Sequence, residues 1–352
     1  MKKLLSLLTL LLLLPGCIKL LPGPQTGNSH TLNVSVLFSE GGRGDHGYND
    51  MAHLGVEQVK ADFGSAVTIK YFDFTANYDF LLRLQGQSSM DVVIIIGGYN
   101  YIDSIIKIAK EFPKTRFVVV DGYISGLTEH DNITCINFKV QEGSFLVGAM
   151  AALKSTSGKI GFIGGIKRPE IERFETGFTA GAKYIKPEIK IIADYIGNTL
   201  ASFKNFEKGE ELAEEQYKNG VDVIFHAAGA SGFGVISVAE KQKKWVIGVD
   251  TDQALLLPTD QRPYILTSMI KKVDTAVYNA IAASINKEIK GGYITYGLAE
   301  NSVGYAENQY NAVEIKESKE TVEKIKAKII AKEIIIPDRT GSPFVTQGSL
   351  VE

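Results

Sequence analysis

The sequence predicts an α/β protein made of two similar lobes, each built on a parallel sheet. Apolar runs of strand length alternate with amphipathic stretches of helical length, which is the pattern of βαβ units. The chain also contains one unit twice. The unit runs from an apolar strand through a glycine turn and a helix to a second apolar strand, and this second strand ends on an aspartate. One copy spans residues 91–121 and the other spans residues 222–250. At 352 residues, the chain is long enough for two domains of about 100–200 residues each.

Ten apolar runs are predicted to be strands, and four amphipathic stretches are predicted to be helices. The runs in the first half cover residues 32–38, 67–74, 91–97, 116–122 and 133–138. Those in the second half cover residues 159–165, 189–197, 221–229, 245–250 and 265–270. The helical stretches cover residues 102–111, 170–184, 205–219 and 272–286. The lobes are expected to join near residues 138–141.

The N-terminus is predicted to be a signal peptide over residues 1–16. Lys2 and Lys3 precede an apolar run over residues 4–14, which is too short to span a membrane comfortably. The sequence LPGC that follows resembles a bacterial lipobox, whose cysteine, here Cys17, becomes lipid-modified. An ordinary signal peptide with an incidental cysteine is the alternative. With residues 17–30 as a linker, we expect a lipid-anchored protein on the extracytoplasmic side of the cell membrane.

Composition and motifs exclude several classes of function. The net charge is −2 and no basic block stands out, so nucleic acid is not an expected partner. The sequence contains no P-loop and no nucleophile elbow, and its five histidines lack metal-ligand spacing. We therefore expect no enzyme, no metal and no cofactor. Cys135 lies in an apolar run and is predicted to be a buried, inert thiol.

The paired aspartates are the strongest candidates for ligand contacts. Asp121 and Asp250 each close an apolar strand, and ligands of open α/β sheets bind at the carboxyl ends of the strands. A carboxylate accepts hydrogen bonds from hydroxyl or ring N–H groups. An aspartate that caps the next helix is the alternative. The matched pair favours two carboxylates that face one cleft from opposite lobes.

A glycine-rich loop over residues 41–50 follows the first strand. Tyr48 offers a stacking face, and Asn49 can both donate and accept hydrogen bonds. The loop fits G-x-G-x-x-G, but Asp45 inside it would repel a pyrophosphate. A glycine-rich turn with a helix cap is the alternative interpretation.

Four positions in the second half of the chain are further candidates for ligand contacts. Gly229 lies in a glycine turn after a strand and gives a ligand room to approach the backbone, with simple helix–strand packing as the alternative. Phe203 or Phe206 offers an aromatic face, with a hydrophobic contact at a helix start as the alternative. Lys271 follows a strand and could reach a ligand oxygen or pair with Asp250, although a surface lysine is the common alternative.

These motifs together resemble one family, the basic membrane protein family of bacterial substrate-binding lipoproteins, and especially its purine nucleoside receptors. The resemblance covers nearly the whole chain after the linker. The segments that carry it, in order, are residues 41–50, 117–122, 137–152, 159–165, 174–184, 221–235, 246–253 and 267–274.

The resemblance implies a type I periplasmic-binding-protein fold that closes on a nucleoside and passes it to an ABC transporter permease. The N-terminal lobe would comprise residues 31–138 and 268–292, and the C-terminal lobe would comprise residues 139–267 and 293–352. A monomer is expected.

The resemblance also implies roles for the candidate residues. Asn49 and Asp121 would bind the edge of the base, and Tyr48 and Phe203 would sandwich its faces, with Phe206 as the alternative to Phe203. By the same resemblance, Asp250 and Lys271 would hold the ribose hydroxyls, and Asp45 and Gly229 would complete the pocket. Tyr48 stands where the family often has Phe, and Gly47 stands where it often has Ser.

Three other functions remain open from the sequence. The same fold could bind a sugar or another small ligand, since sugars also stack on aromatic rings. A surface adhesion protein could use the lysine-rich stretch 316–332, although a solvated C-terminal helix explains that stretch more simply. An extracellular enzyme acting on nucleosides would need an acid–base or metal cluster, which the sequence does not show.

Overall fold

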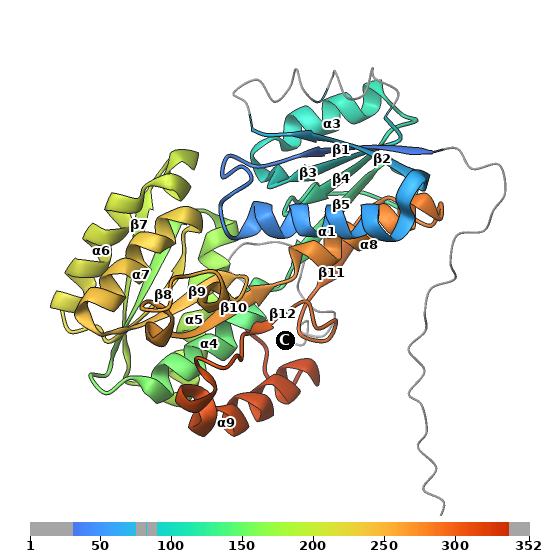
Figure 1. Ribbon diagram of the computed structural model, residues 1–352. Helices are drawn as coiled ribbons and strands as arrows, with labels where there is room; N and C mark the ends of the chain where they lie inside the picture. The colour runs from blue at the N-terminus through green and yellow to red at the C-terminus, as the bar shows by residue number, and fades with distance from the viewer. Residues whose placement is uncertain (1–30, 75–81, 83–89, 338–352) are drawn as a thin grey trace, which may run out of the picture. The chain divides into compact units, whose positions relative to one another are not determined.

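The computed structural model describes residues 31–74, 82 and 90–337, with two six-stranded sheets among them (Figure 1). The predicted signal peptide, Cys17 and the linker lie outside the described residues. Within the described ranges, no helix has both the length and the apolar character required to cross a bilayer.

The first sheet has the strand order β11-β5-β4-β3-β1-β2, and all its neighbouring strands are parallel. Every residue of β3 is buried, as expected for a parallel strand that helices cover on both faces. Its strands are β1 (Leu32–Leu37), β2 (Val67–Phe72), β3 (Val92–Ile96), β4 (Arg116–Val120), β5 (Ile133–Phe138) and β11 (Gly292–Tyr296). The helices beside it are α1 (Tyr48–Phe63), α3 (Ile102–Glu111) and α8 (Val273–Ile285).

The second sheet has the order β12-β10-β9-β8-β6-β7 and is parallel except for β12, which runs antiparallel to β10. Its strands are β6 (Lys159–Ile166), β7 (Lys190–Gly197), β8 (Val223–Ala227), β9 (Trp245–Asp250), β10 (Ile265–Lys271) and β12 (Val303–Tyr305). Its helices are α4 (Val140–Lys154), α5 (Pro169–Ile185), α6 (Phe206–Lys218), α7 (Gly232–Gln242) and α9 (Ala312–Ile330).

The chain passes between the two sheets three times: from β5 to α4, from β10 to α8, and from β11 to β12. The predicted lobe boundaries at 267/268 and 292/293 fall inside strands. The first lies inside β10, which pairs with β9 of the second sheet, and the other lies inside β11, which pairs with β5 of the first sheet. α8 returns to the first sheet, where it packs on α1.

The predicted fold class is confirmed, and each of the ten predicted strands is present. The helix α4 is not among the amphipathic stretches that the sequence shows. This helix is buried from Val140 to Ala152 except at Glu142, so it lacks the alternation of apolar and polar faces by which an amphipathic helix is detected. The strands β11 and β12 were also not predicted. β12 has only three residues, and β11 (GYITY) is mostly exposed or half-buried and so lacks a continuous apolar run.

Candidate functional site

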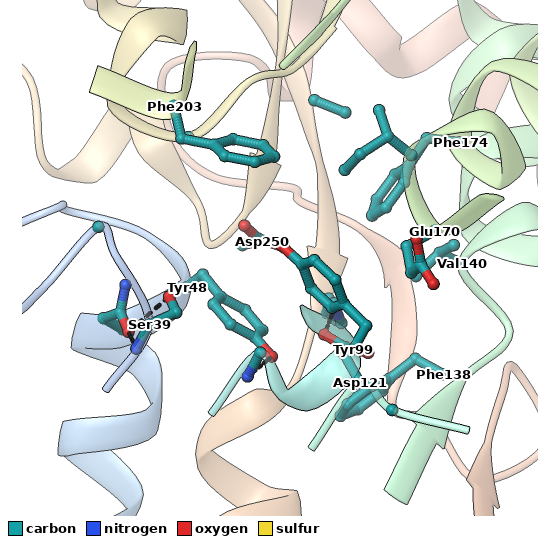
Figure 2. Close-up of a pocket in the computed structure, with 18 of the residues that line it drawn as sticks. Ser39, Tyr48, Tyr99, Asp121, Phe138, Val140, Glu170, Phe174, Phe203 and Asp250 are labelled. Atoms are coloured by element: carbon teal, nitrogen blue, oxygen red, sulfur yellow. Dashed lines mark hydrogen bonds and ion pairs between the residues drawn. The ribbon is translucent and has the colours of Figure 1, made fainter. Parts of the chain in front are cut away.

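A cavity of about 360 Å³ lies where the carboxyl ends of strands from both sheets meet (Figure 2). Its volume falls at the lower end of the range of small-molecule sites, about 300–1,000 Å³. The first sheet and its loops contribute Ser39, Tyr48, Tyr99, Asp121 and Asn137, among others, and the second contributes Glu170, Phe174, Phe203, Gly229, Asp250 and Lys271. All the predicted contact residues line this cavity except Phe206.

Asp121 and Asp250 occupy equivalent places in the two sheets. Asp121 directly follows β4, and Asp250 is the last residue of β9. Their φ angles are 53° and 67°, so both aspartates have the left-handed conformation that few residues other than glycine adopt. The short helical turn after β9 has Asp252 rather than Asp250 at its N-cap position. The backbone thus turns sharply where each carboxylate enters the cavity.

Lys271 pairs with Asp121, so an ion pair joins the two sheets across the cavity. The Lys271 side chain is almost completely buried. Its Nζ lies 4.7 Å from the centroid of the Tyr48 ring and 5.0 Å from that of Phe138, which are cation–π distances. The sequence also allows Asp250 as the partner of Lys271, but the end of β10 brings the ammonium group to Asp121.

Asp250 has a different environment from Asp121. It is 8% exposed, and none of the residues that the structure describes hydrogen-bonds its carboxylate. Burial raises its pKa to about 7; Lys271 opposes this shift, and the charges of Asp121 and Asp45 add to it. A buried carboxylate in a cavity is costly unless it receives hydrogen bonds, so Asp250 is suited to a ligand that carries hydroxyl or N–H donors.

The carboxylate and amide side chains of the glycine-rich loop, residues 41–50, form hydrogen bonds within the loop and with the start of α1. The Asp45 carboxylate accepts from the backbone N–H groups of Gly47, Asn49 and Asp50 at 3.0, 2.9 and 3.1 Å. Asn49 Nδ2 also donates to Asp45 Oδ2 at 2.9 Å, and Asn49 Oδ1 accepts from the N–H and hydroxyl of Ser39 at 2.9 and 3.0 Å. Asp45 therefore satisfies the free N–H groups at the start of α1, which matches the helix-cap alternative for this loop.

Tyr48 projects from the first turn of α1 into the cavity (Figure 2). Its hydroxyl accepts a hydrogen bond from the Gly97 N–H at 3.1 Å. Burial, and secondly the Asp121 charge, raise the pKa of Tyr48 well above its usual value. The hydroxyl is thus held against the first sheet, and the ring is left as part of the wall.

The structure brings Phe203 to the cavity and does not bring Phe206 there. Phe203 lies in a short 3-10 helix, Leu200–Lys204, and its ring packs so closely on Gly165 that a Cβ at that glycine would lie 2.2 Å from it. Phe206 is the first residue of α6 and is 39% exposed. The reason is local: Asn205 caps α6 by accepting from the Lys208 N–H at 3.0 Å, so the helix begins after the turn that carries Phe203.

Several cavity residues were not identified from the sequence. Tyr99 follows β3, and Glu170 follows β6 at the start of α5. Neither closes an apolar run as the aspartates do, since Tyr99 lies beyond the Gly97–Gly98 turn and Glu170 lies four residues after β6, so the sequence carries only a weak signal for them. Burial raises the pKa of Tyr99, and the charge of Glu170 is the next cause, which shows that side chains from the two sheets approach each other here. In the described part of the chain, no group of three or more His, Cys, Asp or Glu side chains could hold a metal ion.

Comparisons with known proteins agree with this architecture. Residues 32–340 match the family model described as "ABC transporter substrate-binding protein PnrA-like". The CD4+ T-cell-stimulating antigen of Listeria monocytogenes is 35% identical over 333 residues, which is 89% of this chain and 90% of that protein. Basic membrane protein A of Borreliella burgdorferi is 34% identical over 326 residues, covering 91% and 92% of the two chains.

Among solved structures, a solute-binding protein of an ABC transporter system from Aeropyrum pernix K1 superposes with a TM-score of 0.76 at 25% identity, covering 87% of this chain and 93% of that one. A glucose-galactose binding protein from Geobacillus stearothermophilus has the same fold, with a TM-score of 0.56 at 17% identity over 78% of this chain and 97% of that one. Both are named as solute-binding proteins, and the matched family is one of solute-binding proteins rather than enzymes. On the extent of the family match and the identity to its members, the chain belongs to the PnrA-like family of ABC transporter substrate-binding proteins.

Proposed function

We propose that the protein captures purine nucleosides in the cavity between its two sheets and delivers them to an ABC transporter permease for import. The observation that carries the proposal is Asp250. Its carboxylate is buried, receives no hydrogen bond from the described residues, and lies in a cavity with aromatic walls. A ligand with adjacent hydroxyl groups and a flat ring would satisfy both features.

The aromatic walls suit a planar base. Figure 2 shows the rings of Tyr48 and Phe203 on opposite sides of Asp250. Base–aromatic stacking contributes about 1–3 kcal/mol per base and tolerates different bases because each has a π-face. A base between Tyr48 and Phe203 would leave its ribose near Asp250, whose two oxygens can accept from neighbouring hydroxyls.

The edge of the base would meet polar groups of the first sheet. Asp121 remains a candidate acceptor, with its charge balanced by Lys271. Asn49 is a weaker candidate than the sequence analysis expected, because its Oδ1 and one N–H already serve the loop. Asn137 also lines the cavity, where its Nδ2 donates to the Gly122 carbonyl at 3.1 Å and its Oδ1 is an additional acceptor for a ring N–H.

We further propose that Cys17 carries a lipid anchor and that the domain works outside the cytoplasm, beside the permease. The basic start, the apolar run and the sequence LPGC support this part of the proposal. So do the relatives named as basic membrane proteins. Metabolic labelling of the expressed protein with a radioactive fatty acid tests the anchor; wild type should be labelled and Cys17→Ala should not.

A sugar receptor is the second candidate. The observation that favours it is again Asp250 beside an aromatic wall, because sugars present hydroxyl groups and apolar ring faces. The glucose-galactose binding protein with this fold shows that the architecture accommodates a sugar in that protein.

Isothermal titration distinguishes the two candidates. The chain without its signal peptide and lipidated cysteine would be titrated with adenosine, guanosine and inosine, and in parallel with ribose, glucose and galactose. Binding of at least one nucleoside, with no binding of the free sugars, is the expected result. If no nucleoside binds at high micromolar concentration, the nucleoside proposal is wrong, and mass spectrometry of ligand retained through purification would identify the real solute class.

A further inference from the structure

The ladder between β8 and β9 ends before either strand reaches the cavity. Its last pair is Phe225 and Ile247, whereas β9 remains paired with β10 as far as Asp250 and Ile270. The strands β8 and β9 therefore separate over the residues that line the cavity between them. A backbone N–H group in such a gap needs another partner if it is buried.

The side chain of Gln253 fills this gap. Its Oε1 accepts the Val249 N–H at 3.0 Å, and its own backbone N–H donates to Ser268 Oγ at 3.2 Å. Gln253 is 2% exposed and Ser268 is fully buried. Val249 directly precedes Asp250, so the side-chain amide holds the backbone one residue before the left-handed turn.

Two glycines leave room for this arrangement. A Cβ at Gly248 would lie 2.4 Å from Gln253 Oε1 and 2.6 Å from Ser268 Oγ. A Cβ at Gly232 would lie 2.1 Å from Cε1 of His226, the buried ring that faces Gln253 from β8. Neither His226 nitrogen meets hydrogen-bond geometry with a described group. The two glycines thus leave room for the Gln253 amide and for the buried His226 ring beside it.

We propose that Gln253 is a positioning residue for ligand binding: its side chain takes the place of strand β8 at the Val249 amide and so holds Asp250 in the left-handed conformation that presents its carboxylate to the cavity. Ser268 fixes the Gln253 backbone by accepting its N–H, and the buried His226 ring lies beside the Gln253 side chain. The inference rests on the proposed function only for the choice of ligand used to test it.

A double-mutant cycle tests whether Gln253 acts through Asp250. Gln253→Leu removes the acceptor at similar size and should weaken adenosine binding about tenfold, a loss of about 1.4 kcal/mol. In the Asp250→Asn background the same substitution should change the affinity less than about twofold. Equal losses in both backgrounds would overturn the proposal, because Gln253 would then act independently of Asp250.

Gln261→Leu is the matched control, since the same substitution there removes an amide that donates to Glu240 at 3.2 Å and does not line the cavity. This variant should bind adenosine within about threefold of the wild type. A loss as large as that of Gln253→Leu would contradict the positioning role.

Amide hydrogen exchange provides a test that needs no ligand. In the wild type, the Val249 N–H should exchange slowly, and in Gln253→Leu it should exchange about tenfold faster or more, with the Val246 N–H unchanged as the internal reference. Unchanged exchange at Val249 would overturn the proposal. If adenosine, guanosine and inosine all fail to bind the wild type, the proposed function fails, while this measurement still decides the role of Gln253.

Discussion

Lys271 at the end of β10 forms an ion pair with Asp121 at the end of β4, so that one charged contact joins the second sheet to the first inside the cavity. The Lys271 side chain is 6% exposed and that of Asp121 is 17% exposed, so solvent and salt screen the pair weakly. A ligand that enters the cavity must bind beside this pair or exchange its own polar groups for one of the partners.

Replacing Lys271 by Met should lower the free energy of unfolding by about 3 kcal/mol, because Asp121 would lose its buried partner. Urea unfolding measures the change. Lys290→Met is the control, since the Lys290–Glu129 pair at 2.9 Å has side chains that are 71% and 56% exposed. That variant should lose less than about 1 kcal/mol, and equal losses in the two variants would argue against a buried, stabilising pair.

Nucleoside affinity should depend on pH through Asp250. Burial raises the pKa of Asp250 to about 7, so the carboxylate becomes protonated as the pH falls below this value and loses acceptor capacity. The affinity should therefore rise from about pH 6 to about pH 8 and then level off. Titration calorimetry across this range tests the prediction. Asp250→Asn should bind weakly with a flat pH profile; a wild-type profile that is already flat would contradict the role of Asp250.

His226 should make the protein less stable in acid. Burial lowers its pKa to about 4, compared with 6.5 in the unfolded chain. Between these values the unfolded state binds a proton that the folded state does not, so stability rises with pH across the window and is lost as the pH falls from about 6.5 to about 4. The full contribution is about 3 kcal/mol.

Asp250 has the opposite effect over part of that window, because its folded pKa is raised and its contribution to stability is lost as the pH rises toward 7. The slope of unfolding free energy against pH should therefore be compared between wild type and His226→Asn. His226→Asn should not show the decrease in unfolding free energy that the wild type shows as the pH falls from about 6.5 to about 4. Parallel slopes in the two proteins would exclude His226 as the cause.

Phe203→Ala should weaken nucleoside binding about tenfold or more, since it removes one stacking face. Phe206→Ala is the natural control, because Phe206 begins the next helix and does not line the cavity. Its affinity should stay within about twofold of the wild type. A larger effect of Phe206→Ala than of Phe203→Ala would reverse the assignment.

Asp45→Ala should destabilise the fold by about 1–2 kcal/mol, because the N–H groups at the start of α1 would lose their acceptor. Thermal unfolding measures this effect. Asp73→Ala is a control nearby, since Asp73 is exposed and bonded to Arg43 by a surface pair; it should cost less than about 1 kcal/mol. If Asp45→Ala reduced affinity with no loss of stability, Asp45 would be a ligand contact rather than a structural cap.

The two central aspartates of the site were predictable because one rule applies to both. In a parallel sheet the strand ends gather at one edge, so an aspartate that closes a buried strand lies in the ligand crevice. This rule identified Asp121 and Asp250 from the patterns FVVVD and VIGVD alone. It does not identify Tyr99 or Glu170, because Tyr99 lies beyond the Gly97–Gly98 turn and Glu170 lies four residues after β6, so neither closes an apolar run.

The sequence by itself determined the βαβ order, the burial of the strands and the positions of the two aspartates, because each depends on residues that are close together along the chain. Only the tertiary structure decided which side chains pair with each other or with the backbone inside the site. Lys271 pairs with Asp121 across 150 residues, and Gln253 completes a ladder that β8 leaves open. These side-chain partners depend on which strand ends meet in the folded protein and on how far neighbouring strands separate. They also depend on which acceptors remain free once the backbone N–H groups are satisfied. No pattern of neighbouring residues encodes these relationships.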